Sequence, residues 1–263
     1  MGYGKGGKVT PGSMCAFGLG IILVFLAIYP AVAASAEPAP CKVVAFEDSR
    51  FVVCGYRRET DELKLAWRGS TGPLGGFDGL AAWLGPDAKR VRFAMNGGMF
   101  DPQQAPVGLL VLSGELQHQA DTAKGQGNFY LLPNGVFWAE ANGSVHVDET
   151  GRFLARGILP MWATQSGPLL VRGGVLHPAI AENGSSLAVR NGVGVRDPDE
   201  AFFVISSEPV SFGRFARLFR DHLRCPDALY LDGAVSSLWA PNLARRDPAS
   251  RLGPLIVVST KRP

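Results

Sequence analysis

Short runs of alternating apolar and polar residues follow one another along most of this chain, separated by Gly, Pro, Asn and Asp. This spacing is typical of antiparallel β-sheet, in which one side chain in two faces the core. We expect strands at residues 42–46, 51–53, 62–67, 91–95, 107–112, 115–118, 128–132, 136–140, 144–147, 202–205, 228–231 and 255–259. The middle of the chain is therefore predicted to be rich in β-structure.

Helical spacing is rarer. A short helix is expected at Leu80–Leu84, ended by Gly85-Pro86. Apolar residues recur at helical spacing from Phe212 to Leu223, where Ser211 can cap the start and Pro226 prevents continuation. The pattern predicts an α+β fold: a mixed, mostly antiparallel β-sheet core with a few packed helices.

The N-terminus follows a different pattern. Two lysines precede an apolar run at residues 15–29, and small residues follow at 31–36. This order is typical of a secretory signal peptide, which we expect at residues 1–36. An uncleaved anchor is the alternative, because the run approaches the roughly 20 residues that span a bilayer. Residues 37–263 are then one exported domain, periplasmic or secreted.

Composition agrees with a single folded domain, because the chain has 263 residues of which 46% are apolar. The net charge is only +3 and the 26 basic residues are scattered. Such a distribution does not argue for a nucleic-acid partner, nor for a membrane partner beyond the N-terminal segment. A small anionic substrate remains compatible with it.

Export makes disulfides available to the three cysteines that follow the leader. Cys41 and Cys54 lie at the open end of the hairpin formed by residues 42–46 and 51–53, so we predict that they bridge. The bridge closes a short loop worth roughly 3 kcal/mol in the chain-entropy model. Cys225 is then a buried free thiol. The alternative is that all three are small core residues.

Chemically versatile residues collect where predicted strands end. The strand at 91–95 runs into Asn96-Gly97-Gly98 and Asp101, which brings an amide, a carboxylate and two glycine N–H groups into a small space. The strand at 228–231 ends in Asp232-Gly233, which places a second carboxylate on a rigid support. Turn formation alone also explains each pair of residues.

Three further groups are candidates. Arg190 lies at the far end of a buried strand that turns at Asp197, so it needs an anionic partner, either a carboxylate or a ligand. Ser166-Gly167 forms a polar corner, and Ser236-Ser237 follows the Asp232 turn. Capping roles account for these serines equally well.

Other site classes find little support. The four histidines show no zinc-ligand spacing and no Cys-x-x-Cys occurs. Ser166 lacks a nucleophile-elbow pattern, and the glycine pairs match neither a dinucleotide loop nor a Walker loop. Asp101 and Asp232 are weak grounds for Ca²⁺ or Mg²⁺, and we expect no cofactor.

Taken together, the motifs resemble those of the phosphodiester glycosidase family, in its bacterial periplasmic branch. The resemblance covers Val91–Val258. It rests on five motifs in family order: Asn96-Gly97-Gly98-x-Phe100; Pro106-x-Gly108; Ser166-Gly167-Pro168-x-Leu170; Arg190 with Gly194; and Leu231-Asp232-Gly233 with Ser236-Ser237. Two positions depart from the family pattern, because Asn191 replaces a frequent threonine and Ala234-Val235 replaces glycines.

The resemblance implies a hydrolase that cleaves the bond between a sugar anomeric carbon and a phosphodiester. Asp232 would act as base or nucleophile, with Asp101 as second choice, and Arg190 would hold the phosphate. Asn96 would hydrogen-bond the sugar or the phosphate. The Gly97 and Gly98 amides would serve as N–H donors, with Ser166, Gly167, Ser236 and Ser237 as substrate contacts. The alternative is an exported protein that binds a glycan or envelope polymer in the same pocket without turnover.

Overall fold

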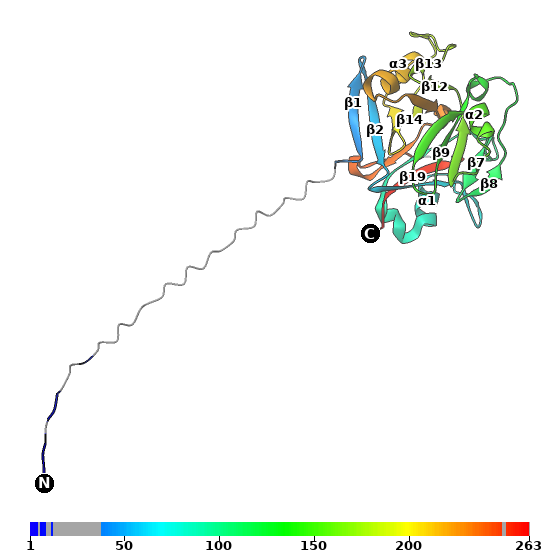
Figure 1. Cartoon of the computed structure of the whole chain (residues 1–263). Helices are drawn as coiled ribbons and strands as arrows, with labels where there is room; N and C mark the ends of the chain where they lie inside the picture. The colour runs from blue at the N-terminus through cyan, green and yellow to red at the C-terminus, as the bar shows by residue number, and fades with distance from the viewer. Residues whose placement is uncertain (5, 9–11, 13–37, 249–250, 263) are drawn as a thin grey trace. The chain divides into compact units, whose positions relative to one another are not determined.

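The computed structural model describes residues 1–4, 6–8, 12, 38–248 and 251–262 (Figure 1). The apolar run of the expected signal peptide lies outside these residues. Pro38–Pro263 forms one compact unit.

One large sheet has seven strands in the order β1-β2-β15-β14-β16-β12-β13, and every pairing is antiparallel (Figure 1). Both faces of its central strands are buried: Val52 and Cys54 face one side of β2, and Phe51 and Val53 the other. The strands are β1 (Cys41–Phe46), β2 (Ser49–Arg57), β15 (Glu200–Ser206), β14 (Asn191–Asp197), β16 (Asp227–Tyr230), β12 (Leu169–Arg172) and β13 (Val175–Leu176).

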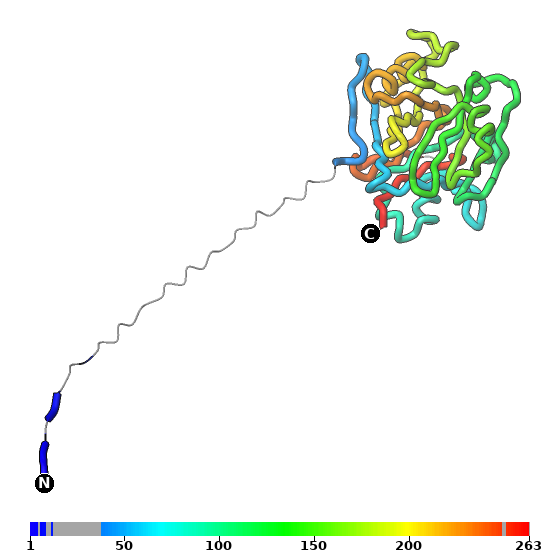
Figure 2. Tube along the Cα trace, in the orientation of Figure 1, coloured from blue at the N-terminus to red at the C-terminus, as the bar shows by residue number. Residues whose placement is uncertain are grey.

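Two five-stranded sheets, also antiparallel, complete the framework. The first runs β10 (Val145–Glu149), β9 (Gly135–Ala139), β11 (Trp162–Ser166), β7 (Leu110–Leu112) and β8 (Glu115–His118). The second runs β18 (Arg245–Arg246), β17 (Leu238–Ala240), β6 (Val91–Asn96), β19 (Leu255–Thr260) and β3 (Asp61–Ala66). A small ribbon pairs β4 (Arg68–Gly69) with β5 (Gly72–Pro73). Figure 2 shows the C-terminal strand β19, in red, returning beside earlier parts of the chain.

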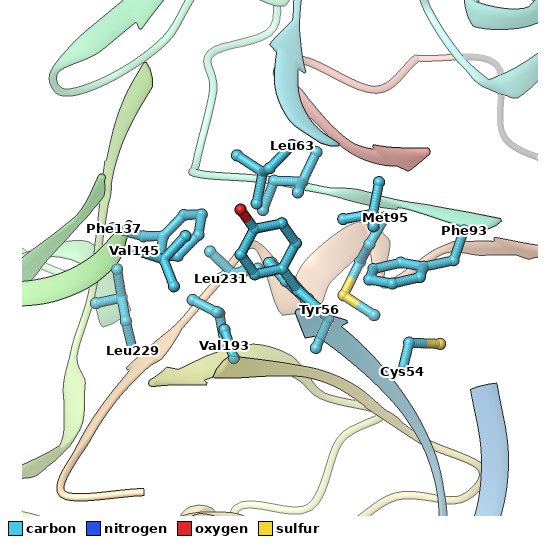
Figure 3. Packing of buried hydrophobic residues seen from close by; sticks show 14 of the residues in the cluster. Cys54, Tyr56, Leu63, Phe93, Met95, Phe137, Val145, Val193, Leu229 and Leu231 are labelled. Carbon is cyan, nitrogen blue, oxygen red and sulfur yellow. The ribbon is translucent and has the colours of Figure 1, made fainter. Parts of the chain in front are cut away.

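A central core joins the inward faces of all three sheets. Phe203 of β15 contacts the rings of Phe137 of β9 and Phe93 of β6, with centroids 5.5 and 5.3 Å apart. Phe137 and Phe93 are among the core side chains in Figure 3. Removing these side chains from water stabilises the fold by roughly 2 kcal/mol each. One core therefore holds the three sheets in fixed positions.

Helices cover the outward faces of the sheets. Phe215 of α3 and Phe219 of η3 pack on the seven-stranded sheet, Phe77 of α1 on the second five-stranded sheet, and Phe153 of α2 on the first. The helices are α1 (Phe77–Leu84), α2 (Thr150–Ala155) and α3 (Phe212–Arg217), the π-turn η3 (Leu218–His222), and the 3₁₀ turns η1 (Gly85–Arg90), η2 (Asn128–Tyr130), η4 (Gly233–Val235) and η5 (Pro241–Leu243). The expected α+β class is confirmed.

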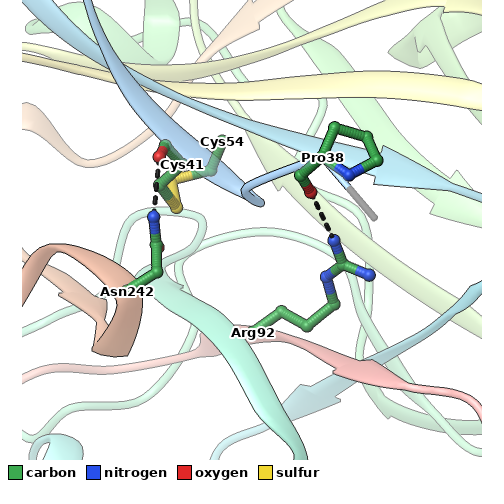
Figure 4. Close-up of a disulfide and its surroundings, with 5 residues drawn as sticks. All are labelled: Pro38, Cys41, Cys54, Arg92 and Asn242. Carbon is green, nitrogen blue, oxygen red and sulfur yellow. Dashed lines mark hydrogen bonds between the residues drawn. A yellow bond between two sulfur atoms is a disulfide. The ribbon is translucent and has the colours of Figure 1, made fainter. Parts of the chain in front are cut away.

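The predicted disulfide is confirmed. Cys41 and Cys54 are directly opposite in the β1–β2 register, with Cα atoms 4.0 Å apart, and their sulfurs are bonded (Figure 4). Asn242 Nδ2 donates to the Cys41 carbonyl at 2.8 Å. Cys225 is a buried free thiol, as expected, and burial raises its pKa to about 12.

One predicted strand was wrong, one helix begins earlier than expected but ends where predicted, and one helix was not predicted. Residues 128–132 contain the 3₁₀ turn η2 (Asn128–Tyr130) and not a strand, because β10 and β11 already pair with both edges of β9. Helix α1 ends at Leu84, as expected. Pro86 does not stop the chain there, because a proline in the first turn of a helix needs no N–H partner, and the chain continues as η1. Helix α2 had no clear periodic signal in the sequence, since only Thr150 and Phe153 are buried on it.

Candidate functional site

The ends of four strands meet at one place in the second five-stranded sheet and the neighbouring seven-stranded sheet. β6 ends at Asn96, β14 begins at Asn191, β16 leads to Asp232, and Ser237 precedes β17. Gly192 pairs with Tyr230 across β14 and β16, which brings the residues just beyond them together. Antiparallel register therefore gathers motifs that lie up to 141 residues apart in sequence.

Asn96 is the centre of this junction. Its Nδ2 donates to the Asp232 carbonyl at 2.7 Å, and its Oδ1 accepts from the Ser237 amide and from Asn191 Nδ2, both at 2.9 Å. The residue is 1% exposed. An amide with these three partners fixes the relative positions of the strand ends, and this differs from the expectation that it contacts the substrate.

Asp232 is held by its main chain on both sides. Its N–H donates to the Gly97 carbonyl at 3.1 Å, and its own carbonyl accepts from Asn96. Its Oδ1 accepts from the Ala234 amide at 3.1 Å, which caps η4, while Oδ2 makes no hydrogen bond to a described residue. Burial raises the pKa of this carboxyl to about 6, although the Ala234 N–H acts in the opposite direction.

Arg190 is buried, as the sequence predicted, and among residues 38–248 and 251–262 it pairs with no acidic group. Its Nε donates to the Val210 carbonyl and its Nη2 to the Ser186 carbonyl, each at 2.8 Å. The guanidinium carbon lies 3.5 Å from the Phe212 ring centroid and 5.5 Å from that of Tyr230. Burial lowers the pKa of Arg190. A buried cation without a counter-ion favours an anionic ligand.

The two motif glycines do not offer free donors, so that expectation was wrong. The Gly97 N–H donates to the Pro254 carbonyl at 2.7 Å and the Gly98 N–H to Thr164 Oγ1 at 3.2 Å. A Cβ on Gly98 would lie 2.3 Å from the Gln165 carbonyl oxygen. Just beyond the end of β6, Gly97 therefore allows close packing against Pro254 and the start of β19, and Gly98 allows close packing against β11.

Asp101 has a local role. Its Oδ1 accepts from the amides of Gln103 and Ala105, each at 2.9 Å, so this carboxylate closes its own turn. No hydrogen bond among the described residues joins it to Asp232. Among the described residues, no group of three or more His, Cys, Asp or Glu side chains is placed to hold a metal ion.

The four remaining predicted contacts divide into two pairs. Ser237 is bonded to Asn96, and Ser236 Oγ lies 3.3 Å from Asn191 Oδ1, so both belong to the junction. Ser166 is fully buried at the end of β11, and its Oγ has no hydrogen-bond partner among the described residues. A Cβ on Gly167 would lie 2.6 Å from the carbonyl oxygen of Phe129, so this position is packed and not open.

Two site residues were missed by sequence reasoning. Asn191 Nδ2 contacts both the carbonyl and the side-chain oxygen of Asn96, and Tyr230 Oη accepts from Arg190 Nη1 at 3.4 Å. A signal for Tyr230 was present, because it precedes Asp232 by two positions, and alternate residues of a strand share a face. Asn191 was noted only as a departure from the family pattern, and nothing local to it indicated its contact with Asn96.

Comparison with known proteins defines the family. Residues 89–258 match the model of the family described as phosphodiester glycosidase. The chain is also 32% identical over 225 residues to the uncharacterised protein YigE of Escherichia coli (strain K12), covering 83% of this chain and 84% of that protein. The chain belongs to the phosphodiester glycosidase family. The resemblance drawn from the motifs is confirmed.

Solved structures of this fold include the catalytic domain of zebrafish N-acetylglucosamine-1-phosphodiester α-N-acetylglucosaminidase, auto-inhibited by its pro-peptide. It superposes on this phosphodiester glycosidase domain with a TM-score of 0.58 at 12% identity, over 87% of this chain and 85% of that one. A putative exported protein of Burkholderia pseudomallei gives 0.51 at 13% identity, over 80% and 74%. These likenesses establish a shared fold. Within the described residues, no helix is long and apolar enough to span a bilayer.

Proposed function

We propose that this protein is an exported hydrolase that cleaves the bond between the anomeric carbon of a sugar and a phosphodiester. The observation that carries the proposal is that Tyr230 stands between Asp232, a nearly buried carboxyl with a pKa raised to about 6, and Arg190, a buried cation without an acidic partner among the described residues. Tyr230 links the two, because it contacts Arg190 and ends strand β16 two positions before Asp232. The fold and family of the chain support this assignment.

The proposed cleavage requires only one reactive carboxylate. A phosphate monoester is a weakly basic leaving group, so protonation of the departing oxygen contributes less than for an ordinary glycoside. Above a pH of about 6 Asp232 is ionised and its Oδ2 is uncommitted. Asp232 then acts as base toward water or as nucleophile at the anomeric carbon. The positive charge of Arg190 stabilises the negative charge that grows on the departing phosphate.

Export is part of the proposal. The Cys41–Cys54 disulfide favours an oxidising compartment, and one structural neighbour is described as an exported protein. Both agree with the expected signal peptide at residues 1–36.

A direct test compares purified mature protein with Asp232→Asn and Arg190→Lys on a panel of sugar-1-phosphodiesters that includes UDP-N-acetylglucosamine. We expect sugar release by the wild type and a loss of at least about 100-fold in Asp232→Asn. NMR of the first anomer released distinguishes a base from a nucleophile. If no panel member is hydrolysed, or if Asp232→Asn is fully active, the proposal fails. Saturable binding without turnover would instead favour the non-catalytic glycan-binding alternative.

A further inference from the structure

Arg190 is enclosed on nearly every side. The Phe212 ring covers one face of the guanidinium, and the Val210 and Ser186 carbonyls accept from Nε and Nη2. The residue is 1% exposed, and its Nη1 points to the Tyr230 hydroxyl. A ligand therefore has little direct access to this cation. Its contacts continue through the hydroxyl of Tyr230, a side chain that is itself only 2% exposed, toward the Asp232 turn, where Asp232 is 9% exposed.

The Tyr230 hydroxyl has a hydrogen to give. Its oxygen accepts from Arg190, and no acceptor for its own hydrogen occurs among residues 38–248 and 251–262. Burial raises the pKa of Tyr230, so the phenol stays protonated at neutral pH. A hydroxyl that accepts from a guanidinium is polarised and becomes a stronger donor.

Glycine at position 233 explains how this hydroxyl reaches the Asp232 turn. A Cβ on Gly233 would lie only 1.7 Å from Tyr230 Oη, so the phenol oxygen sits directly against the glycine backbone. Gly233 follows the carboxylate that we propose to react. The donor hydrogen and the Asp232 carboxylate are thus presented by one turn and the strand before it.

We propose that Tyr230 is the residue that donates a hydrogen bond to the bound anion, and that Arg190 is a positioning residue that acts through it. The identity of the anion as a sugar phosphodiester rests on the proposed function. The contact itself requires only an anionic oxygen at the Asp232 turn. Tyr230→Phe removes this hydroxyl and leaves the ring that packs against Phe212 and Phe215.

The test measures the affinity for inorganic phosphate and for UDP-N-acetylglucosamine by calorimetry, with kcat and KM wherever turnover occurs. We expect Tyr230→Phe to weaken binding of either ligand about tenfold or more. Tyr56→Phe is the matched control, because it removes another buried hydroxyl, one that donates to the Gly143 carbonyl at 2.6 Å. We expect that control to bind both ligands like the wild type.

A double-mutant cycle tests the second half of the proposal. If Arg190 acts through Tyr230, Arg190→Lys weakens binding in the wild-type background but adds little to Tyr230→Phe. Additive effects overturn the positioning role, because they mean that Arg190 contacts the anion independently. Unchanged affinity and KM in Tyr230→Phe, or no phosphate binding by the wild type, overturn the assignment to Tyr230.

These outcomes are separable from those of the proposed function. Phosphate binding that depends on Tyr230, in a wild type that hydrolyses nothing, supports the anion contact and refutes the hydrolase. Hydrolysis by the wild type, with an unchanged KM in Tyr230→Phe, supports the hydrolase and refutes the anion contact. Because Tyr230→Phe alone decides the contact, the test does not depend on whether Arg190→Lys folds.

Discussion

Replacing Asp232 by Asn should make the protein more stable at neutral pH while abolishing its proposed activity. The pKa of Asp232 is raised from an ordinary 3.8 to about 6 by burial, so ionising it is harder in the folded state than in the unfolded chain. A difference of one in pKa corresponds to 1.36 kcal/mol, which gives about 3 kcal/mol for this carboxyl. Asn is nearly isosteric, keeps an acceptor for the Ala234 amide and carries no charge.

The sign follows from proton linkage. Below pH 3.8 the carboxyl is protonated in both states, and its contribution to stability is fully present. As pH rises through the raised pKa of about 6, the wild type loses that contribution and Asp232→Asn does not. The difference in unfolding free energy between variant and wild type should therefore grow in favour of the variant by about 2 kcal/mol between roughly pH 4 and pH 8.

The assay is urea unfolding of both proteins at about five pH values across this range. The intrinsic cost of the substitution is the same at every pH, so only the change with pH reports the Asp232 titration. Asp199→Asn is the control: Arg58 lowers the pKa of that exposed carboxyl below its ordinary 3.8, so its titration lies below this range and its difference from the wild type should stay nearly constant across it. If the stability of Asp232→Asn differs from that of the wild type by a constant amount at all pH values, the claim of a buried, hard-to-ionise carboxyl is refuted.

Three other predictions concern the surroundings of this carboxyl and the sheet edge. Gly233→Ala places a Cβ 1.7 Å from Tyr230 Oη and should cost about 1–3 kcal/mol in thermal or urea unfolding, with loss of anion binding. Asn191→Ala leaves the side-chain oxygen of Asn96 short of a donor and should cost about 2 kcal/mol, with a fall in kcat larger than the change in KM. A double change of Cys41 and Cys54 to Ser should cost about 3 kcal/mol in unfolding experiments without reductant.

Each of these predictions has a matched control. Gly151→Ala should be neutral, since a Cβ there meets nothing within 4 Å. Asn242→Ala removes a hydrogen bond to the Cys41 carbonyl and should lower stability without altering kcat. Reductant should reproduce the effect of the double cysteine change in the wild type and leave the double variant unaffected. A Gly233→Ala variant with wild-type stability and anion affinity would contradict the close approach of Tyr230.

Local pattern was sufficient where an element's own residues decide its structure. The β1–β2 hairpin, the capping of α3 by Ser211 and the buried thiol of Cys225 were all predicted from neighbouring residues, and all are confirmed. Pattern failed at residues 128–132, whose alternation suits a strand, because no edge of β9 was free to pair with one. Availability of a partner strand is a property of the whole sheet.

In the site, too, features set by neighbouring residues were predicted and features set by remote strands were not. Asp232 and Arg190 were recognised as a strand-end carboxylate and a buried cation, but the roles of the motif glycines and of Asn96 were misjudged. Their hydrogen-bond partners, such as Pro254 and Thr164, come from remote strands, and sequence adjacency says nothing about them. The N–H groups of Gly97 and Gly98 and the side-chain amide of Asn96 were predicted to be free donors, but they hydrogen-bond to residues of other segments.

The sequence by itself determined the alternation that makes the strands, the cysteine pair, and the ordered motifs that indicate the family. Only the tertiary structure decided which strand ends meet, that Arg190 has no acidic partner among the described residues, and that Asp232 ionises near a pH of about 6. The physical reason is how far along the chain the residues that determine each property lie. Side-chain alternation is set by the backbone of each strand, whereas burial, desolvation and hydrogen-bond satisfaction depend on every segment that packs against a residue.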